Sequence, residues 1–229
     1  MFKHRSYTKE LLDADDIPRP DLVQNLKELD IINNLLGGYS ISFNALKKVL
    51  VKGRHAIVAD IGCGGGDTLK RMHKWAVKNG YDLELYGVDL KQVCIDYATS
   101  NNSGNAGIRL ICDDYKNTHN YIDRIDVLHA CLFCHHLSET EIITLIHFAQ
   151  TNKITLVIND LERNAVAYYS IKLLTALFSK SYLVKNDAPL SVLRGFKKKE
   201  WQKLLERSGA PRYSISNKWA FRHEVIVHP

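Results

Sequence analysis

Four side chains able to bind a metal or carry a proton lie between positions 131 and 136. Cys131-x-x-Cys134-His135 matches the attachment pattern of a c-type haem, and cysteine with histidine is also a ligand set for zinc. Residues three apart on a strand point to opposite faces, so the two cysteines would share a metal only if the strand ended between them. Because cysteine is among the most often buried residue types, we predict small core residues and no metal.

A second chemically distinctive stretch is the glycine-rich turn in HAIVADIGCGGGDTLK. An apolar run leads into Asp60, Gly62, Cys63 and Gly64, and a helical pattern follows. Glycines at such a turn remove the Cβ atoms that would block close approach of a ligand. A dinucleotide fingerprint would need glycine at position 67, which is Asp67, and a carboxylate there would repel a pyrophosphate. The turn therefore does not fit a dinucleotide.

Alternating strands and helices must position these residues. Apolar runs at 56–61, 83–88, 108–112, 127–131 and 154–158 predict strands, and helical patterns at 68–78, 92–99 and 139–150 lie between most of them. Ser138 and Glu141 form a capping box that begins the last of these helices. This alternation predicts parallel βαβ units, in which ligands bind where the strands end.

The rest of the chain departs from this alternation. Helices are expected at 21–36, 43–51 and 198–208, and two final strands at 213–216 and 221–227. The segment 161–195 is helical and aromatic, and we interpret it as a lid-like insertion after the fifth strand. The expected organisation is an N-terminal helical cap over 1–50 followed by a main domain over 51–229.

The spacing D-x-G-x-G-x-G, with an acidic residue after the second and third predicted strands, resembles the class I S-adenosylmethionine-dependent methyltransferases. It is most similar to the ubiquinone/menaquinone-biosynthesis type of small-molecule enzyme, from about residue 50 to the end. This resemblance implies a Rossmann-like, doubly wound α/β sheet of seven strands, mostly parallel with the last antiparallel. It also implies S-adenosylmethionine as cofactor and S-adenosylhomocysteine as product.

The resemblance assigns cofactor residues to the strand ends. Asp89 is expected to accept both ribose hydroxyls, and Asp114 the adenine amino group, with Asp113 as a competing candidate and the backbone of Tyr115 beside the ring. The remaining cofactor positions are Asp60, Gly62, Cys63, Gly64, Leu90 and Cys131.

The acceptor side is predicted from other residues. His135 and His136 follow the fourth strand and titrate near neutrality, so either has the chemistry of a base or an orienter. Tyr168 and Tyr169 in the insertion, and Arg194 after it, are candidates for the substrate pocket.

The expected reaction is O- or C-methylation of a phenolic, quinol-like or polyketide-like small molecule by a monomer or homodimer. Two alternatives remain open: an RNA methyltransferase, which the net charge of +6 permits although nucleic acid is not the favoured partner, and a non-catalytic cofactor- or metal-binding protein. The first residues contain no apolar signal segment, and no apolar run approaches the roughly 20 residues of a membrane helix. We therefore expect a cytoplasmic protein without a membrane partner.

Overall fold

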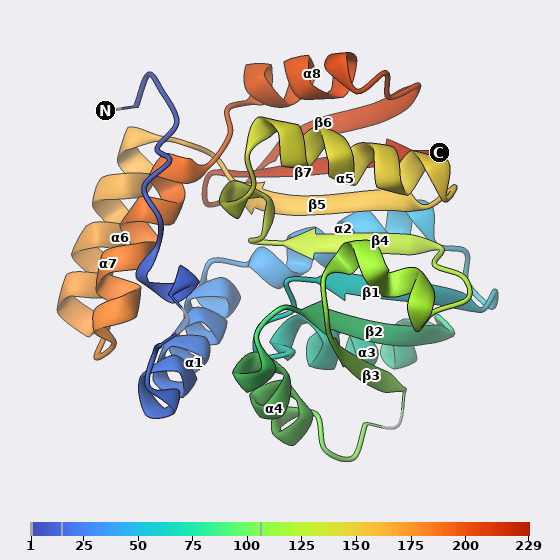
Figure 1. Cartoon of the computed structure of the whole chain (residues 1–229), viewed down its shortest axis with the longest axis horizontal. Coiled ribbons are helices and arrows are strands. Elements are labelled where there is room, and N and C mark those ends of the chain that lie inside the picture. The colour runs from blue at the N-terminus through green and yellow to red at the C-terminus, as the bar shows by residue number, and fades with distance from the viewer. Residues whose placement is uncertain (1, 15, 106) are drawn as a thin grey trace.

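A seven-stranded sheet forms the centre of the protein (Figure 1). The computed structural model describes residues 2–14, 16–105 and 107–229. The strand order is β3-β2-β1-β4-β5-β7-β6, and β7 runs antiparallel to both of its neighbours while the other pairs are parallel. This confirms the predicted Rossmann-like sheet. The strands are β1 (Ala56–Ile61), β2 (Leu83–Asp89), β3 (Ile108–Cys112), β4 (Val127–Cys131), β5 (Thr155–Leu161), β6 (Arg212–Lys218) and β7 (Arg222–His228).

Helices cover both faces of the sheet. The α-helices are α1 (Arg19–Leu35), α2 (Gly38–Val49), α3 (Asp67–Asn79), α4 (Gln92–Asn101), α5 (Glu139–Thr151), α6 (Ala165–Phe178), α7 (Tyr182–Arg194) and α8 (Lys198–Arg207). Three short 3-10 helices are η1 (Leu11–Asp13), η2 (Tyr115–Asn120) and η3 (Cys134–His136). The predicted capping box starts α5, since Ser138 Oγ accepts from the Glu141 amide and the Glu141 carboxylate accepts from the Ser138 amide.

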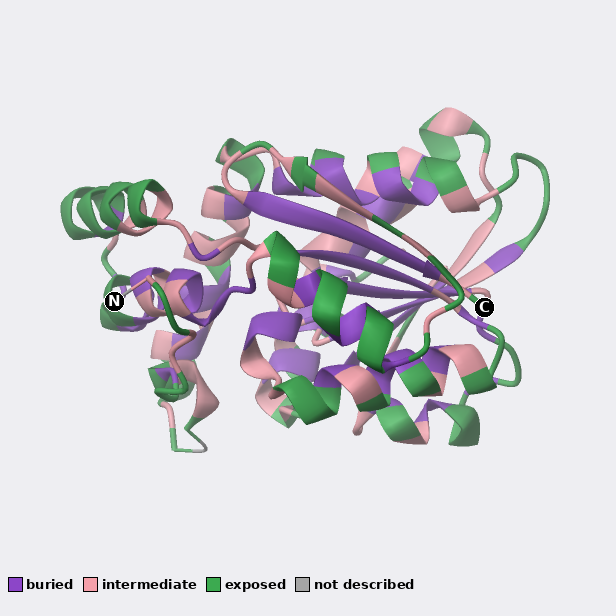
Figure 2. Ribbon diagram, turned by 90° about the horizontal axis from the view of Figure 1, so that it is seen from above, coloured by how far each residue is buried: buried purple, intermediate pink, exposed green. Residues whose placement is uncertain are grey.

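The two faces follow from the alternation of side chains along each strand. On β4, Val127 packs with α2, α3 and α4, whereas its neighbour Leu128 packs with α5 and α8. On β5, Val157 likewise packs with α2, α3 and α4, and Leu156 packs with α5 and α8. Both faces are apolar because a parallel sheet is covered on both sides. Figure 2 shows the strands as the most buried layer of the protein.

A helical extension stands beside the sheet rather than on it. The predicted insertion 161–195 contains the helical hairpin of α6 and α7, which lies against η1 and α1 (Figure 1). Within the predicted N-terminal cap over 1–50, α1 contacts both α2 and α7, and α2 also packs on the sheet through Ala45 and Leu46. Among the described residues, no helix has the length and apolar character to cross a membrane.

We predict that Leu128→Ala destabilises the fold by about 2–5 kcal/mol, because Leu128 is fully buried and the truncation leaves a cavity between the sheet and α5. Chemical denaturation measures the loss. Val77→Ala on the exposed side of α3 is the control and should change stability by less than about 0.5 kcal/mol. Equal losses in the two variants would contradict this assignment of the core.

Candidate active site

A cavity of about 860 Å³ opens at the carboxyl ends of β1, β2 and β4. One half is lined by the glycine-rich turn, including Gly62 and Gly64, and by Asp89. The other half is lined by Glu10, by the α6–α7 hairpin and by the residues that follow β4. Its volume lies in the range of small-molecule and cofactor pockets, about 300–1,000 Å³. It therefore joins the two sites that the sequence singled out.

The glycine-rich turn brings its backbone close to neighbouring side chains. Gly62 and Gly64 have φ angles of +64° and +51°, in the region that side chains with a Cβ rarely adopt. A Cβ on Gly62 would stand 2.3 Å from Cδ2 of Phe133, so only glycine fits beneath that ring. Phe133, which the sequence interpretation did not single out, thus forms part of the cavity wall.

Asp89 stabilises the turn and faces the cavity. One carboxylate oxygen accepts from the Gly64 amide at 2.9 Å and the other from the Lys91 amide at 2.9 Å. Burial raises the pKa of Asp89 above its usual value although both amides favour the charged form. Leu90, directly after the strand, also lines the cavity.

Two neighbouring carboxylates after β3 differ in how many protein partners they have. Asp113 accepts from Asn117, from the Tyr121 hydroxyl and from the Asp114 amide, and the two side-chain bonds lead in lowering its pKa. Asp114 accepts one bond, from the Lys116 amide at 3.0 Å. Both line the cavity, as does Tyr115, which is 7% exposed. Asp114 has the greater capacity left for a ligand.

A row of buried polar side chains runs beneath the cavity, and the sequence interpretation missed most of it. Asp60 on β1 lies beside His129 on β4, with 2.6 Å between the carboxylate and Nδ1. His129 Nε2 is 2.9 Å from the Ser42 hydroxyl, which also accepts from Asn159 on β5. His129 and Asn159 lie on the same face of the sheet as Asp60. Alternate residues of a strand share a face, so this pattern in the sequence could have indicated both residues.

His135 and His136 both line the cavity, each beside a carboxylate. His135 Nδ1 is 2.7 Å from Asp160, which also accepts from the His135 amide at 2.9 Å. Burial alone would raise the pKa of Asp160, but the charge and hydrogen bonds of His135 hold it below its usual value. His136 Nδ1 is 3.2 Å from Asp13. Both imidazoles are groups able to accept a proton in this half of the cavity.

Glu10 belongs to the same cluster although it is 125 residues away from His135 in sequence. It is 5% exposed and accepts from the Ser191 hydroxyl at 2.8 Å. Burial raises its pKa to about 7. Its place in the site depends on how the N-terminal segment folds back over α7, and no local pattern in the sequence indicates that.

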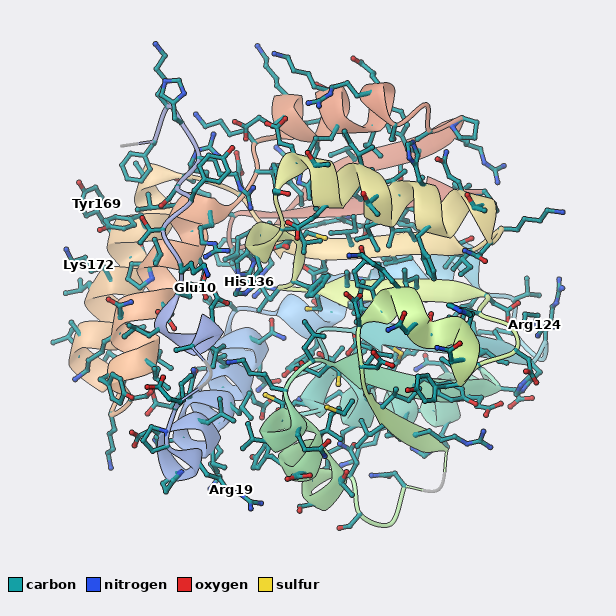
Figure 3. All side chains as sticks on the ribbon, in the orientation of Figure 1. Glu10, Arg19, Arg124, His136, Tyr169 and Lys172 are labelled. Atoms are coloured by element: carbon teal, nitrogen blue, oxygen red, sulfur yellow. The ribbon has the colours of Figure 1, made fainter. Side chains whose placement is uncertain are left out.

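The three predicted substrate-pocket residues lie outside the cavity wall. The residues of α6 that line the cavity are Ala167, Ser170, Ile171 and Leu174, one helical face. Tyr168 and Tyr169 therefore point elsewhere and pack against Phe2. Figure 3 shows Tyr169 and Lys172 on the far side of α6 from Glu10 and His136.

Arg194 has a structural role that the sequence interpretation did not foresee. It is 6% exposed, and its guanidinium donates to the backbone oxygens of His135 and His136, both at 3.1 Å. It also donates to the carbonyl of Thr8 and to Asp13. Arg194 therefore joins the loop after β4 to the N-terminal segment instead of facing a substrate.

The two cysteines do not converge. β4 ends at Cys131, and Leu132 turns the chain with a φ of +55°, so the strand does end between them. Cys134 is packed in the apolar core, whereas Cys131 lines the cavity beside Asn159. Burial raises the pKa of Cys131 to about 11, so its thiol stays protonated at neutral pH. In the part of the chain that the structure describes, neither cysteine joins a group able to hold a metal.

Residues 58–152 match the family model described as a methyltransferase domain. Among curated protein sequences, none is significantly similar to the chain. This domain match supports the predicted methyltransferase, and the strand order agrees with the fold predicted for it. The narrower resemblance to ubiquinone/menaquinone enzymes is not confirmed.

Solved structures with the same fold include the plantazolicin methyltransferase BpumL in complex with SAH, at 18% identity and a TM-score of 0.66 over 93% of this chain and 91% of that one. A SAM-dependent methyltransferase from Aquifex aeolicus has 16% identity and a TM-score of 0.60, over 93% and 98%. The CMeT domain structure of the citrinin polyketide synthase has 12% identity and a TM-score of 0.58. This alignment covers 80% of our chain but only 49% of the citrinin structure, so our chain spans about half its length.

We predict that His129→Leu costs about 3–5 kcal/mol of folding stability, because it leaves the Asp60 carboxylate buried without its imidazole partner. Urea denaturation gives the value. His55→Leu removes a histidine from an exposed pair with Asp82 and should cost less than about 1 kcal/mol. A loss in His129→Leu no larger than this control would show that Asp60 does not depend on His129.

Proposed function

We propose that the protein transfers the methyl group of S-adenosylmethionine to an oxygen or carbon of a phenolic, quinol-like or polyketide-like small molecule. The observation that carries this proposal is the single cavity that extends from Gly64 and Asp89 to His135 and His136. Donor and acceptor bound in its two halves would lie in contact, and positioning alone supplies much of the rate of such a transfer.

The donor half suits the cofactor in shape and charge. Asp89 would accept the ribose hydroxyls and Asp114 the adenine amino group, while Gly62 and Gly64 allow close backbone approach. Asp60 adds a buried carboxylate on the same side, which favours a cationic sulfonium and amino group. Asn25 on α1 lines this cavity with both side-chain polar atoms unpartnered among the described residues, and it would hydrogen-bond to the polar end of the cofactor.

The acceptor half suits an apolar compound with one polar edge. Ile171, Leu174, Val184 and Val192 of the hairpin line it, and the imidazoles of the loop after β4 supply the polar groups. We infer that the α6–α7 hairpin acts as the lid over this compound, as lids exclude water from such reactions.

The transfer would break the sulfonium S–CH₃ bond, whose electron pair stays on sulfur, and form a bond from the methyl carbon to the acceptor. For a phenol or enol, the hydroxyl proton has to leave. His135 and His136 are proposed as base or orienter in this step, since Asp160 and Asp13 hold their Nδ1 atoms and Nε2 of each ring faces Glu10 on the cavity wall.

Two of the similar structures add support for a small-molecule substrate. One is a plantazolicin methyltransferase and another a polyketide synthase methylation domain. A quinol of the ubiquinone or menaquinone type stays within the proposed class.

We predict that Asp89→Ala weakens binding of S-adenosylmethionine and S-adenosylhomocysteine by roughly 30- to 1000-fold, the equivalent of about 2–4 kcal/mol lost with two hydroxyl contacts. Isothermal titration calorimetry measures both ligands. Asp82→Ala, at an exposed carboxylate just before β2, is the matched control and should bind as the unaltered protein does. Thermal unfolding of each variant separates lost binding from lost folding. Binding that is unchanged in Asp89→Ala would refute the donor assignment.

We predict that Ile171→Trp raises the KM for the acceptor by at least about tenfold while cofactor affinity stays the same, because the larger side chain fills the acceptor half. Transfer of radiolabelled methyl to a panel of phenols, quinols and β-dicarbonyl compounds identifies an acceptor and then measures KM. Tyr169→Ala, on the outer face of α6, is the control and should leave KM unchanged. A greater effect of Tyr169→Ala would show that the acceptor lies elsewhere.

A further inference from the structure

Three potential metal ligands meet where the N-terminal segment crosses the end of β4. The ligand atoms of Glu10, His135 and His136 all lie within 4.8 Å of one another. Glu10 and His135 are buried, and His136 is half-buried. Figure 3 shows Glu10 and His136 next to each other between the sheet and the helical extension. All three residues line the cavity on its acceptor side.

The hydrogen bonds of the two histidines determine which nitrogen is free. A carboxylate only accepts hydrogen bonds, so the Nδ1 atoms beside Asp160 and Asp13 each carry a proton. Nε2 is then the nitrogen that each ring has left to bind a ligand. His135 Nε2 lies 3.7 Å from one oxygen of Glu10, and His136 Nε2 lies 3.8 Å from the other.

These distances are too long for hydrogen bonds, so Glu10 does not occupy either Nε2 atom. The separation of the donor atoms, within 4.8 Å, leaves room for an ion between them. The two distances to Glu10 are close to the spacing of ligands around zinc, where donors about 2.0–2.1 Å from a tetrahedral metal lie about 3.3–3.5 Å apart. Metal-bound histidines characteristically donate their other nitrogen to a carboxylate, as both histidines do here.

The surrounding charges also favour a divalent cation. The carboxylates around the cluster are Glu10, Asp13, Asp160 and Asp187, and the cations are Arg5 and Arg194. These four carboxylates outnumber the two guanidinium groups by two. Arg194 Nε stands 3.8 Å from Glu10, but its donors are engaged by the backbone oxygens of the histidines and Thr8 and by Asp13.

We propose that Glu10, His135 and His136 bind a divalent metal ion of the zinc or cobalt type, for which two imidazoles and one carboxylate are suitable ligands. Such a site leaves a coordination position open toward the cavity. An acceptor oxygen would occupy it, and this part of the inference rests on the proposed methyl transfer. The oxygen would lose its proton to water on binding the metal, so the histidines would orient the acceptor rather than act as its base.

The direct test is titration of the metal-free protein with Co²⁺, with neither cofactor nor acceptor present. We expect one ion per chain and visible d–d absorption, without the thiolate charge-transfer band that cysteine ligands would give. X-ray absorption of the unaltered protein loaded with zinc should show nitrogen and oxygen ligands at about 2.0–2.1 Å, with the scattering pattern of two imidazoles. This measurement needs no variant and is independent of how well any substitution folds.

His136→Ala and Glu10→Gln should each weaken Co²⁺ binding by at least tenfold, while His119→Ala, at an exposed histidine of η2, should not change it. Absence of saturable binding, a thiolate band, or equal loss in His119→Ala would overturn the proposal. The proposed function is tested separately by cofactor calorimetry. A protein that binds S-adenosylmethionine but no metal refutes the metal site alone, and one that binds metal but no cofactor refutes the methyl transfer alone.

Discussion

The buried carboxylate of Asp160 holds together the edge of the sheet on which the cavity depends. It lies at the end of β5 and accepts from the His135 amide, the His135 ring and the Leu161 amide. A carboxylate with so little exposure is tolerated only when such partners replace water. Through His135 this contact fixes the loop after β4, and through the carbonyls of that loop it fixes Arg194 and the N-terminal segment. The loop after β4 and the N-terminal segment thus share one support at the cavity.

The fold was predictable because its signals are local and repeated. Each buried parallel strand appears as an apolar run, and each is followed by a turn and a helical pattern, as at Ala56–Ile61 and Asp67–Asn79. The surfaces that α1 and α2 cover were not predictable, because only tertiary packing places Leu46 of α2 on the sheet and α1 beside α7. Amphipathic helices do not specify which surface they cover.

The residues of the candidate site that follow strand ends were predictable from the sequence. Those that reach the cavity through contacts between distant segments were not. Asp89, Asp114 and His135 follow strands, and the geometry of a parallel sheet brings such residues to one edge. Glu10 reaches that edge only through contacts with α7. Tyr168 and Tyr169 have the right composition for a pocket, but the helical period turns them away while Ile171 faces inward. The aromatic composition of the segment pointed to α6 as a helix that lines the cavity. Only the backbone geometry shows which face of α6 does so.

Several hydrogen bonds join the N-terminal segment to α7, so a displacement of α7 would move the two together. Asp187 accepts from the amides of Leu11 and Leu12, Ser191 donates to Glu10, and the Ser6 amide donates to the Leu193 carbonyl. Arg194 of α7 also donates to the backbone oxygens of His135 and His136, so a displacement of the hairpin would disturb the contacts of Glu10 and of the histidine loop together. The wall of the cavity and the histidine cluster therefore depend on the same set of contacts.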